Sequence, residues 1–131
     1  MKWVLDKNRP LCPQLCEQVC THIALGKLKP GEKLLSVREV ALAAGVNPNT
    51  VQKAFEMLEA QGILISQRGS GWYVAEDTAA ATQALHSLLE QKTAAYFSAM
   101  QALGMSPADV KLYVSQWQKK TILDRKETSY E

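Results

Sequence analysis

Four polar side chains gather near the start of one predicted helix, and their chemistry suits the edges of nucleic-acid bases. The helix begins at Pro48 and its solvent side carries Asn49, Thr50, Gln52 and Lys53. Amide side chains pair with adenine, cationic side chains pair with guanine, and a hydroxyl pairs with either base. In the major groove, the N-terminal residues of a recognition helix are the ones that meet base edges. These four positions therefore predict a DNA-reading helix.

The same helix has well-defined ends and an apolar inner face. Asn47 is suited to cap it, Pro48 to occupy its first turn and Gly62 to end it. The free N–H groups near Asn47 lie at the positive end of the helix and favour a phosphate. The inner face comprises Val51, Ala54, Phe55 and Leu58. A polar outer face alone is typical of any half-buried helix, so the DNA prediction depends on the neighbouring elements.

A shorter helix precedes the recognition helix. Ser36 and Glu39 are spaced as a capping box, in which each side chain accepts a hydrogen bond from the other residue's backbone N–H. Gly45 can take the left-handed conformation that ends a helix. In the first turn, Arg38 could reach a guanine or a phosphate at the edge of the groove, or pair with a nearby surface acid.

A short hairpin follows the recognition helix. Residues 63–65 and 72–74 have strand-like composition, and a glycine-rich segment joins them. Glycine lets this tip approach DNA closely, and an arginine there could enter a minor groove or hold the backbone. The tip consists of Arg68, Gly69, Ser70 and Gly71. Helix, turn, helix and hairpin together predict a winged helix-turn-helix.

Residues 11–75 resemble the N-terminal domain of the GntR family of bacterial transcription regulators. The matching blocks are GKLKPGEKL (26–34), SVREVA (36–41), GVNPNTVQKAF (45–55), LEAQGIL (58–64) and RGSG (68–71). Residues 47–54 and the short C-terminal part resemble the YtrA subfamily in particular. The resemblance implies a homodimeric repressor on an inverted-repeat operator. It also implies that DNA is contacted by Arg38, Asn49, Thr50 and the wing around Gly69.

Three positions depart from the usual pattern of this family. Leu35 stands where proline is common, and Trp72 stands where threonine is common after the wing tip. Cys12 stands where tyrosine is common, which removes a hydroxyl that could be directed to a phosphate. None of the three departures removes a base-reading residue.

Length and charge limit the class of protein further. The 131 residues carry a net charge of +2, with nine Lys/Arg against six Asp/Glu in residues 1–75 and six against seven beyond. This mild basic excess permits a nucleic-acid partner. Asp6 interrupts the N-terminal segment before an apolar run develops, and no stretch approaches the roughly 20 residues needed to cross a bilayer. We therefore expect a cytoplasmic protein without a membrane partner.

The composition changes to Ala, Leu, Gln and Met in residues 76–131, which predicts a second region. Two helices are expected there, over about 78–103 and from Pro107 onward. Their apolar surface exceeds what a two-helix hairpin can bury, so we expect a homodimer; the alternative is packing against the DNA-binding domain of the same chain. The expected dimer core includes Leu85, Leu89, Tyr96, Met100, Leu103 and Trp117. The fold class is thus mostly α with a small β-wing, a winged helix-turn-helix over 1–75 and a dimerisation hairpin over 76–131.

The C-terminal region leaves little room for a ligand. About 55 residues are too few for the usual cavity of several hundred Å³. A small-molecule effector could still bind at the dimer interface, but the sequence identifies none. We expect no cofactor and no bound metal.

Three cysteines lie on the first predicted helix, over residues 10–27. Cys12, Cys16 and Cys20 are four residues apart, and their odd number argues against a disulfide framework. They also lack the CxxC spacing of common zinc sites. Two interpretations stay open: cysteines used as small apolar residues beside the main stripe, or a thiol sensor of metal or redox state.

Enzymatic activity is not expected. His22 and His86 lie far apart, and neither belongs to a metal-binding or nucleophile motif. The Gly69–Gly71 segment is a turn and not a phosphate loop. The remaining alternative class is a winged helix that contacts proteins and not DNA.

Overall fold

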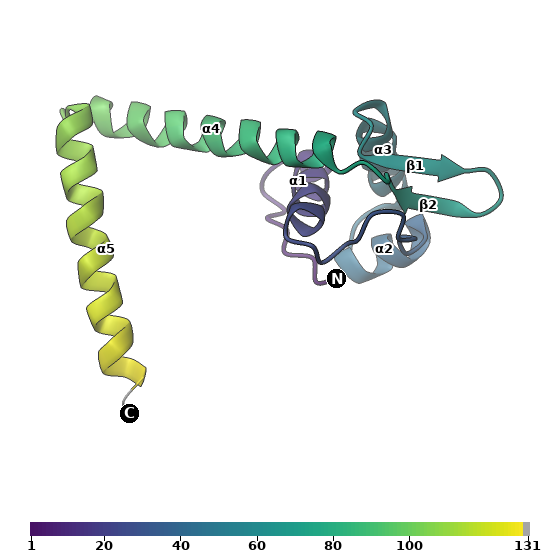
Figure 1. Cartoon of the computed structure of the whole chain (residues 1–131), viewed down its shortest axis with the longest axis horizontal. Coiled ribbons are helices and arrows are strands. Elements are labelled where there is room, and N and C mark those ends of the chain that lie inside the picture. Colours follow the sequence, from purple (N-terminus) through teal and green to yellow (C-terminus); the bar gives the residue numbers. More distant parts are fainter. Residues whose placement is uncertain (130–131) are drawn as a thin grey trace. The chain divides into compact units, whose positions relative to one another are not determined.

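The chain is mostly helical with one small sheet (Figure 1). The computed structural model describes the backbone of residues 1–129 and the side chains of residues 1–122; Tyr130 and Glu131, the end of the predicted C-terminal region, lie outside the described residues. The elements are α1 (Leu11–Ala24), α2 (Val37–Ala44), α3 (Pro48–Ala60), β1 (Leu64–Gln67), β2 (Gly71–Val74), α4 (Ala79–Ala102) and α5 (Pro107–Ser129). They form two compact units, Met1–Leu88 and Leu89–Glu131.

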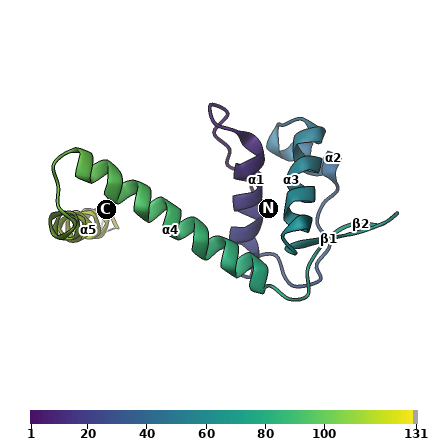
Figure 2. The same ribbon diagram turned by 90° about the horizontal axis from the view of Figure 1, so that it is seen from above.

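The core of the first unit lies between α1, α2 and α3. The four-residue repeat of α1 buries Leu15, Val19 and Ile23, and α1 packs beside α3 (Figure 2). From α3, Phe55 and Leu58 are fully buried in the same cluster. Burying such side chains stabilises the folded chain by about 1.5–3 kcal/mol each. The apolar faces predicted for both helices are therefore the faces that make the core.

Local signals set the ends of the two helices of the helix-turn-helix. Glu39 N donates to Ser36 Oγ at 3.1 Å and Ser36 N donates to Glu39 Oε1 at 3.2 Å, which is the expected capping box. Gly45 has φ of 69°, in the left-handed region, and ends α2. Its carbonyl accepts a hydrogen bond from Lys7 Nζ at 2.8 Å, so the N-terminal segment braces the turn.

The wing is an antiparallel pair of strands with a third extended segment beside it. Leu64 pairs with Val74, and Gln67 pairs with Gly71 at the tip. On the other edge of β2, Val74 N donates to the carbonyl of Glu32 and Leu34 N donates to that of Trp72. Trp72 also meets the ring of Phe55 edge to face, with ring centroids 5.6 Å apart. The tryptophan that departs from the family pattern thus ties the wing to α3.

The first turns of α4 belong to the first unit. Ala81 is buried in its core, and Ala80 and Ala84 pack against the same cluster. Asp77 Oδ1 accepts from Ala79 N at 2.9 Å at the start of the helix. The first turns of α4 therefore lie in the compact unit Met1–Leu88.

The second unit consists of the rest of α4 and of α5. The helices are separated at Gly104, and Ser106 and Asp109 form a second capping box, with both hydrogen bonds at 3.2 Å. The two helices diverge from this turn and do not pack along each other as a closed hairpin (Figure 1). Val110 is the only fully buried apolar residue among those described in this unit. Among the described residues, no helix is long and apolar enough to span a bilayer.

Candidate nucleic-acid interface

Three of the predicted base-reading residues share one hollow at the start of α3. The Asn47 side chain caps this helix by accepting from Asn49 N at 2.8 Å, and Pro48 is its first residue. Asn49, Thr50 and Lys53 line a hollow of about 470 Å³. Asn49 and Lys53 are exposed and Thr50 is half-buried, so all three present polar atoms to solvent. The remaining lining comes from the segment that enters α1.

Gln52 faces a different groove from the other three. It lies with the wing residues around a groove of about 620 Å³ between α3 and the hairpin. Its Nε2 donates to Glu56 Oε1 at 3.0 Å, one turn along the same helix. The sequence placed Gln52 together with the other three, but a helix turns by about 100° per residue, so Gln52 lies about 100° around the helix from Lys53 and about 200° from Thr50.

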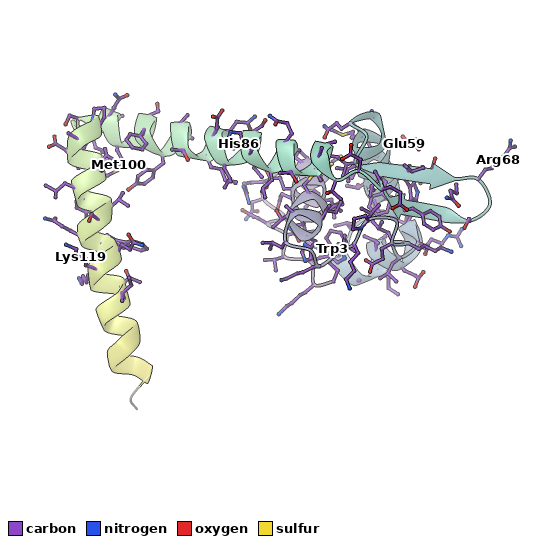
Figure 3. The ribbon with its side chains drawn as sticks, viewed as in Figure 1. Trp3, Glu59, Arg68, His86, Met100 and Lys119 are labelled. Carbon is purple, nitrogen blue, oxygen red and sulfur yellow. The ribbon has the colours of Figure 1, made fainter. Side chains whose placement is uncertain are left out.

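The tip of the wing is exposed and basic. Arg68 projects from it (Figure 3) and Gly69, with φ of 78°, has no heavy atom within 4 Å of where a Cβ would stand. The hydroxyl groups of Ser70 and Tyr73 share a hydrogen bond. Gly71 has φ of 132°, and a Cβ there would lie 3.3 Å from Lys33 Cε. The tip can therefore approach a nucleic-acid backbone closely.

Glu59 holds the base of the wing against α3. Its Oε2 accepts from Ser66 N at 2.9 Å and from Ser66 Oγ at 2.5 Å. These two hydrogen bonds, the hydroxyl's first, lower the pKa of the Glu59 carboxyl below its ordinary value. The wing is thus attached to α3 by Glu59 at its base and by Trp72 in its second strand.

The cations of the site are available to a ligand. Arg38 is exposed in the first turn of α2, and within the described part of the chain neither Arg38, Lys53 nor Arg68 forms an ion pair. Cations on exposed positions without acidic partners are what phosphate and guanine contacts require. Arg38, Lys53 and Arg68 are therefore available to contact a phosphate or a guanine.

Two further basic residues join the site that the sequence alone did not single out. Arg9 lines the same hollow as Lys53, and its Nε lies 3.1 Å from Asp6 Oδ2 in an exposed ion pair. The backbone of Lys33 pairs with that of Tyr73 in an isolated antiparallel β-bridge, beside the wing. The signal for Arg9 was its position directly before Pro10, at the start of a helix; Lys33 had no signal, since its neighbour lies 40 residues away in sequence.

Comparison with known proteins decides the family. The family model for bacterial regulatory proteins of the gntR family matches residues 13–74. A GntR family transcriptional regulator from Listeria monocytogenes has the same fold with a TM-score of 0.76 and 34% identity, covering 86% of this chain and 98% of that one. The chain belongs to the GntR family.

Two other similar proteins are a repressor and a DNA-binding domain. The HTH-type transcriptional repressor YtrA of Bacillus subtilis is 44% identical over 70 residues, which cover 53% of this chain and 54% of YtrA. The DNA-binding domain of AraR, solved in complex with an operator, matches 57% of this chain and 94% of that domain, with 31% identity and a TM-score of 0.50. This GntR-family chain is a transcription regulator with a winged helix-turn-helix for DNA binding.

The three cysteines of α1 do not form a site for metal by themselves. All three are free thiols; Cys20 is buried in the core and Cys16 packs against it, as the apolar interpretation expects. Among the described residues, no three His, Cys, Asp or Glu side chains are arranged to hold a metal ion. Cys12 differs from the other two because it also lines the hollow with Asn49 and Lys53.

Proposed function

We propose that this protein is a homodimeric transcriptional repressor that reads an inverted-repeat operator with α3 and its wing. The observation that carries the proposal is the hollow at the start of α3, where Asn49, Thr50 and Lys53 gather beside the N-terminal end of the helix. Two similar proteins support the proposal: the AraR domain was solved in complex with an operator, and YtrA is a transcriptional repressor. Its relatives are regulators, which favours binding and not catalysis as its activity.

Each polar residue has a role that follows from its position. Asn49 and Thr50, at the tip of the helix, meet base edges in the major groove. Lys53 and Arg38, further out, contact phosphates or a guanine at the groove's edge. Arg68 on the wing enters the neighbouring minor groove, where arginine is favoured by the negative potential. Phosphate contacts position the protein, and base contacts select the sequence.

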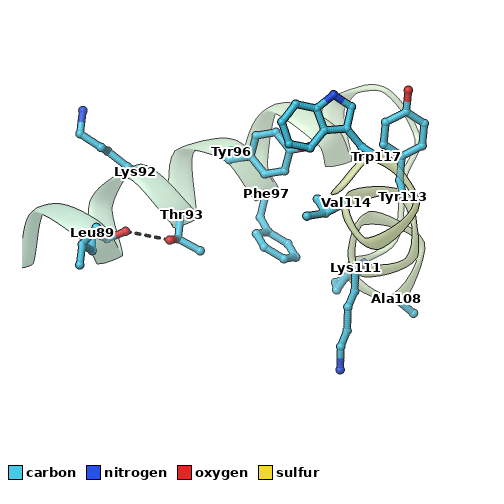
Figure 4. Close-up of a pocket in the computed structure, with 11 residues that line it drawn as sticks. Leu89, Lys92, Thr93, Tyr96, Phe97, Ala108, Lys111, Tyr113, Val114 and Trp117 are labelled. Atoms are coloured by element: carbon cyan, nitrogen blue, oxygen red, sulfur yellow. Dashed lines mark hydrogen bonds between the residues drawn. The ribbon is translucent and has the colours of Figure 1, made fainter. Parts of the chain in front are cut away.

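The second unit supplies the dimer contact. In the single chain the side chains of Leu103, Trp117, Leu89 and Tyr96 are 79%, 60%, 55% and 43% exposed, and Met100 is half-buried, as is Leu85 in the preceding turn of α4, at the end of the first unit. Between α4 and α5 lies a groove of about 1130 Å³ surrounded by Tyr96, Phe97, Val114 and Trp117 (Figure 4). Contiguous apolar surface of this kind marks an interaction site on a soluble protein. A second copy of the chain, presenting the same surface, is the partner that a two-fold arrangement provides.

A two-fold dimer explains how so small a reading surface selects a site. One recognition helix meets only a few base pairs, whereas two helices about 34 Å apart read two half-sites one helical turn apart. The operator then has to be an inverted repeat because the protein pair is symmetric. The proposal therefore links the sequence of the operator to the assembly of the second unit.

Selection of bound duplexes from a random pool by the full-length protein tests the proposal. Enrichment of an inverted repeat with fixed half-site spacing, and binding that weakens steeply with salt, is the expected result. Sedimentation at micromolar concentration should show a dimer in the absence of DNA. Recovery of no common sequence would contradict sequence-specific reading. A monomer in sedimentation would contradict the dimer.

A further inference from the structure

Two sulfur atoms meet where α1 packs against α3, and a third sulfur atom lies one turn along α1. The Cys12 thiol donates to the thioether Sδ of Met57 at 3.4 Å, although the two residues are 45 positions apart. The Cys16 thiol, one turn along α1, donates to the carbonyl oxygen of Ala54 at 3.5 Å, one turn before Met57 on α3. Cys20 lies a further turn away and is buried in the core. We call Cys12, Cys16 and Met57 the sulfur cluster.

The ligands of the sulfur cluster suit a soft metal ion. Thiolate and thioether sulfur select Cu(I), whereas zinc sites use four ligands drawn from thiolate, imidazole and carboxylate. No third His, Cys, Asp or Glu completes such a set among the described residues. Two thiols and one thioether are therefore sufficient for a low-coordinate monovalent ion and insufficient for zinc.

We propose that Cys12, Cys16 and Met57 bind one Cu(I) ion at the contact between α1 and α3. A metal–sulfur bond of about 2.3 Å places two sulfurs of a three-coordinate ion roughly 4.0 Å apart. The present distance of 3.4 Å between Cys12 Sγ and Met57 Sδ needs only a small adjustment, which the flexible methionine side chain can make. Met57 is 40% exposed and Cys12 half-buried, so the ion has a path from solvent.

Coordination of a soft metal ion releases the protons of the two thiols. The ion displaces each proton directly, because a coordinated thiol is deprotonated.

The bound ion would act on the DNA-reading end of α3. Cys12 lines the hollow that contains Asn49, Thr50 and Lys53, and Lys53 lies one turn before Met57. Two neutral thiols and one Cu(I) ion give a dithiolate complex and two released protons, so the charge of the cluster changes from zero to −1. A negative charge beside Lys53 opposes phosphate binding. Copper thus releases the protein from its operator, and this step rests on the proposed function.

Metal binding is measured on the full-length protein, without DNA and without oxygen. Cu(I) is titrated in competition with a chromophoric chelator, and Ag(I) serves as a redox-inert probe of the same site. One ion per chain is expected, and excess Zn(II) should not displace it. Cys12→Ser and Met57→Leu should each weaken binding at least about tenfold. Cys20→Ala is the matched control on the same helix and should bind as the wild type does.

Several results would overturn the site. An affinity unchanged in both Cys12→Ser and Met57→Leu would remove the sulfur cluster as the ligand set, and an equal loss in Cys20→Ala would move the ion elsewhere on α1. Circular dichroism checks the fold of each variant. If Cys12→Ser does not fold, Met57→Leu decides, because methionine and leucine have similar volumes and the exchange disturbs packing little.

Operator binding then separates the site from its regulatory effect. With Cu(I) bound, the wild type should bind the selected operator about tenfold more weakly, and Cys12→Ser should not respond. Operator affinity unchanged by bound copper would overturn the regulatory step. Failure of the metal-free protein to bind any duplex would contradict the proposed function, while the copper titration would still decide the metal site.

Discussion

The two units of this protein differ in how they bury apolar side chains. In the first unit, Leu15, Phe55 and Leu58 are fully buried within a single chain. In the described part of the second unit, Val110 alone is fully buried, and Leu103 and Trp117 face solvent. The difference indicates that the first unit has a complete core, whereas the second leaves apolar side chains that the proposed dimer would bury. The proposed function thereby assigns DNA reading and assembly to separate parts of the chain.

The largest expected effect is the loss of a core ring in the first unit. Phe55→Ala should lower the free energy of unfolding by about 3–5 kcal/mol, because it leaves a cavity and removes the ring that holds Trp72. Chemical denaturation at several protein concentrations measures it. The loss should be independent of concentration if the core belongs to one chain. If the loss of unfolding free energy grows on dilution, the core of the first unit is not formed by one chain alone.

Trp117→Ala should weaken the dimer by about 2 kcal/mol or more, since buried tryptophans dominate many interfaces. The side chain is 60% exposed in one chain, so its removal should scarcely change the unfolding of the first unit. Sedimentation equilibrium gives the dimer dissociation constant. Leu42→Ala, at an exposed leucine of the first unit, is the control and should leave dimerisation unaltered. If the two variants dimerise alike, Trp117 does not lie in the interface.

Asn49→Ala and Lys53→Ala should affect DNA binding in different ways. Loss of the Asn49 amide should cost about 1–3 kcal/mol on the operator and relax specificity at one base pair. Loss of Lys53 should weaken all duplexes alike and reduce the salt slope by about one. Lys27→Ala, beyond the far end of α1, is the control and should bind normally. Equal behaviour of the first two variants would show that Asn49 contacts the backbone and not a base.

A matched pair of helix caps compares the units directly. Ser36 and Ser106 each cap a helix by accepting from the backbone N–H three residues on. Replacing either serine by alanine should cost about 1 kcal/mol. Ser36→Ala should appear in the unfolding of the first unit, and Ser106→Ala in dimer dissociation. Identical effects on both measurements would mean that the two units fold as one cooperative body.

The smallest expected effect is a pH dependence from the base of the wing. Hydrogen bonds from Ser66 lower the pKa of Glu59, so the carboxylate stabilises the fold above its ordinary pKa of about 4.3. That contribution is lost as pH falls through the lower pKa of the folded state. Unfolding followed from pH 6 to pH 3 should lose this dependence in Glu59→Gln. Ser66→Ala should reduce it in part, and an unchanged profile in both variants would contradict the assignment.

Much of the site could be predicted because its signals are local. The capping box at Ser36, the left-handed Gly45 and the Asn47 cap depend on residues within four positions of one another. Each has one favourable geometry, so sequence is enough to place it. Arg9 and Gln52 show the limit: the first approaches Lys53 and the second turns toward the wing only because of how α1, α3 and the hairpin pack.

By itself the sequence determined the helices, the turn, the wing and the family to which they belong, since short-range spacing and capping specify these elements. Only the tertiary structure decided which distant residues meet. It places Cys12 against Met57 and Trp72 against Phe55, and adds the first turns of α4 to the core. The physical reason is that these contacts depend on how whole helices pack. The local spacing of residues along the chain does not specify that packing.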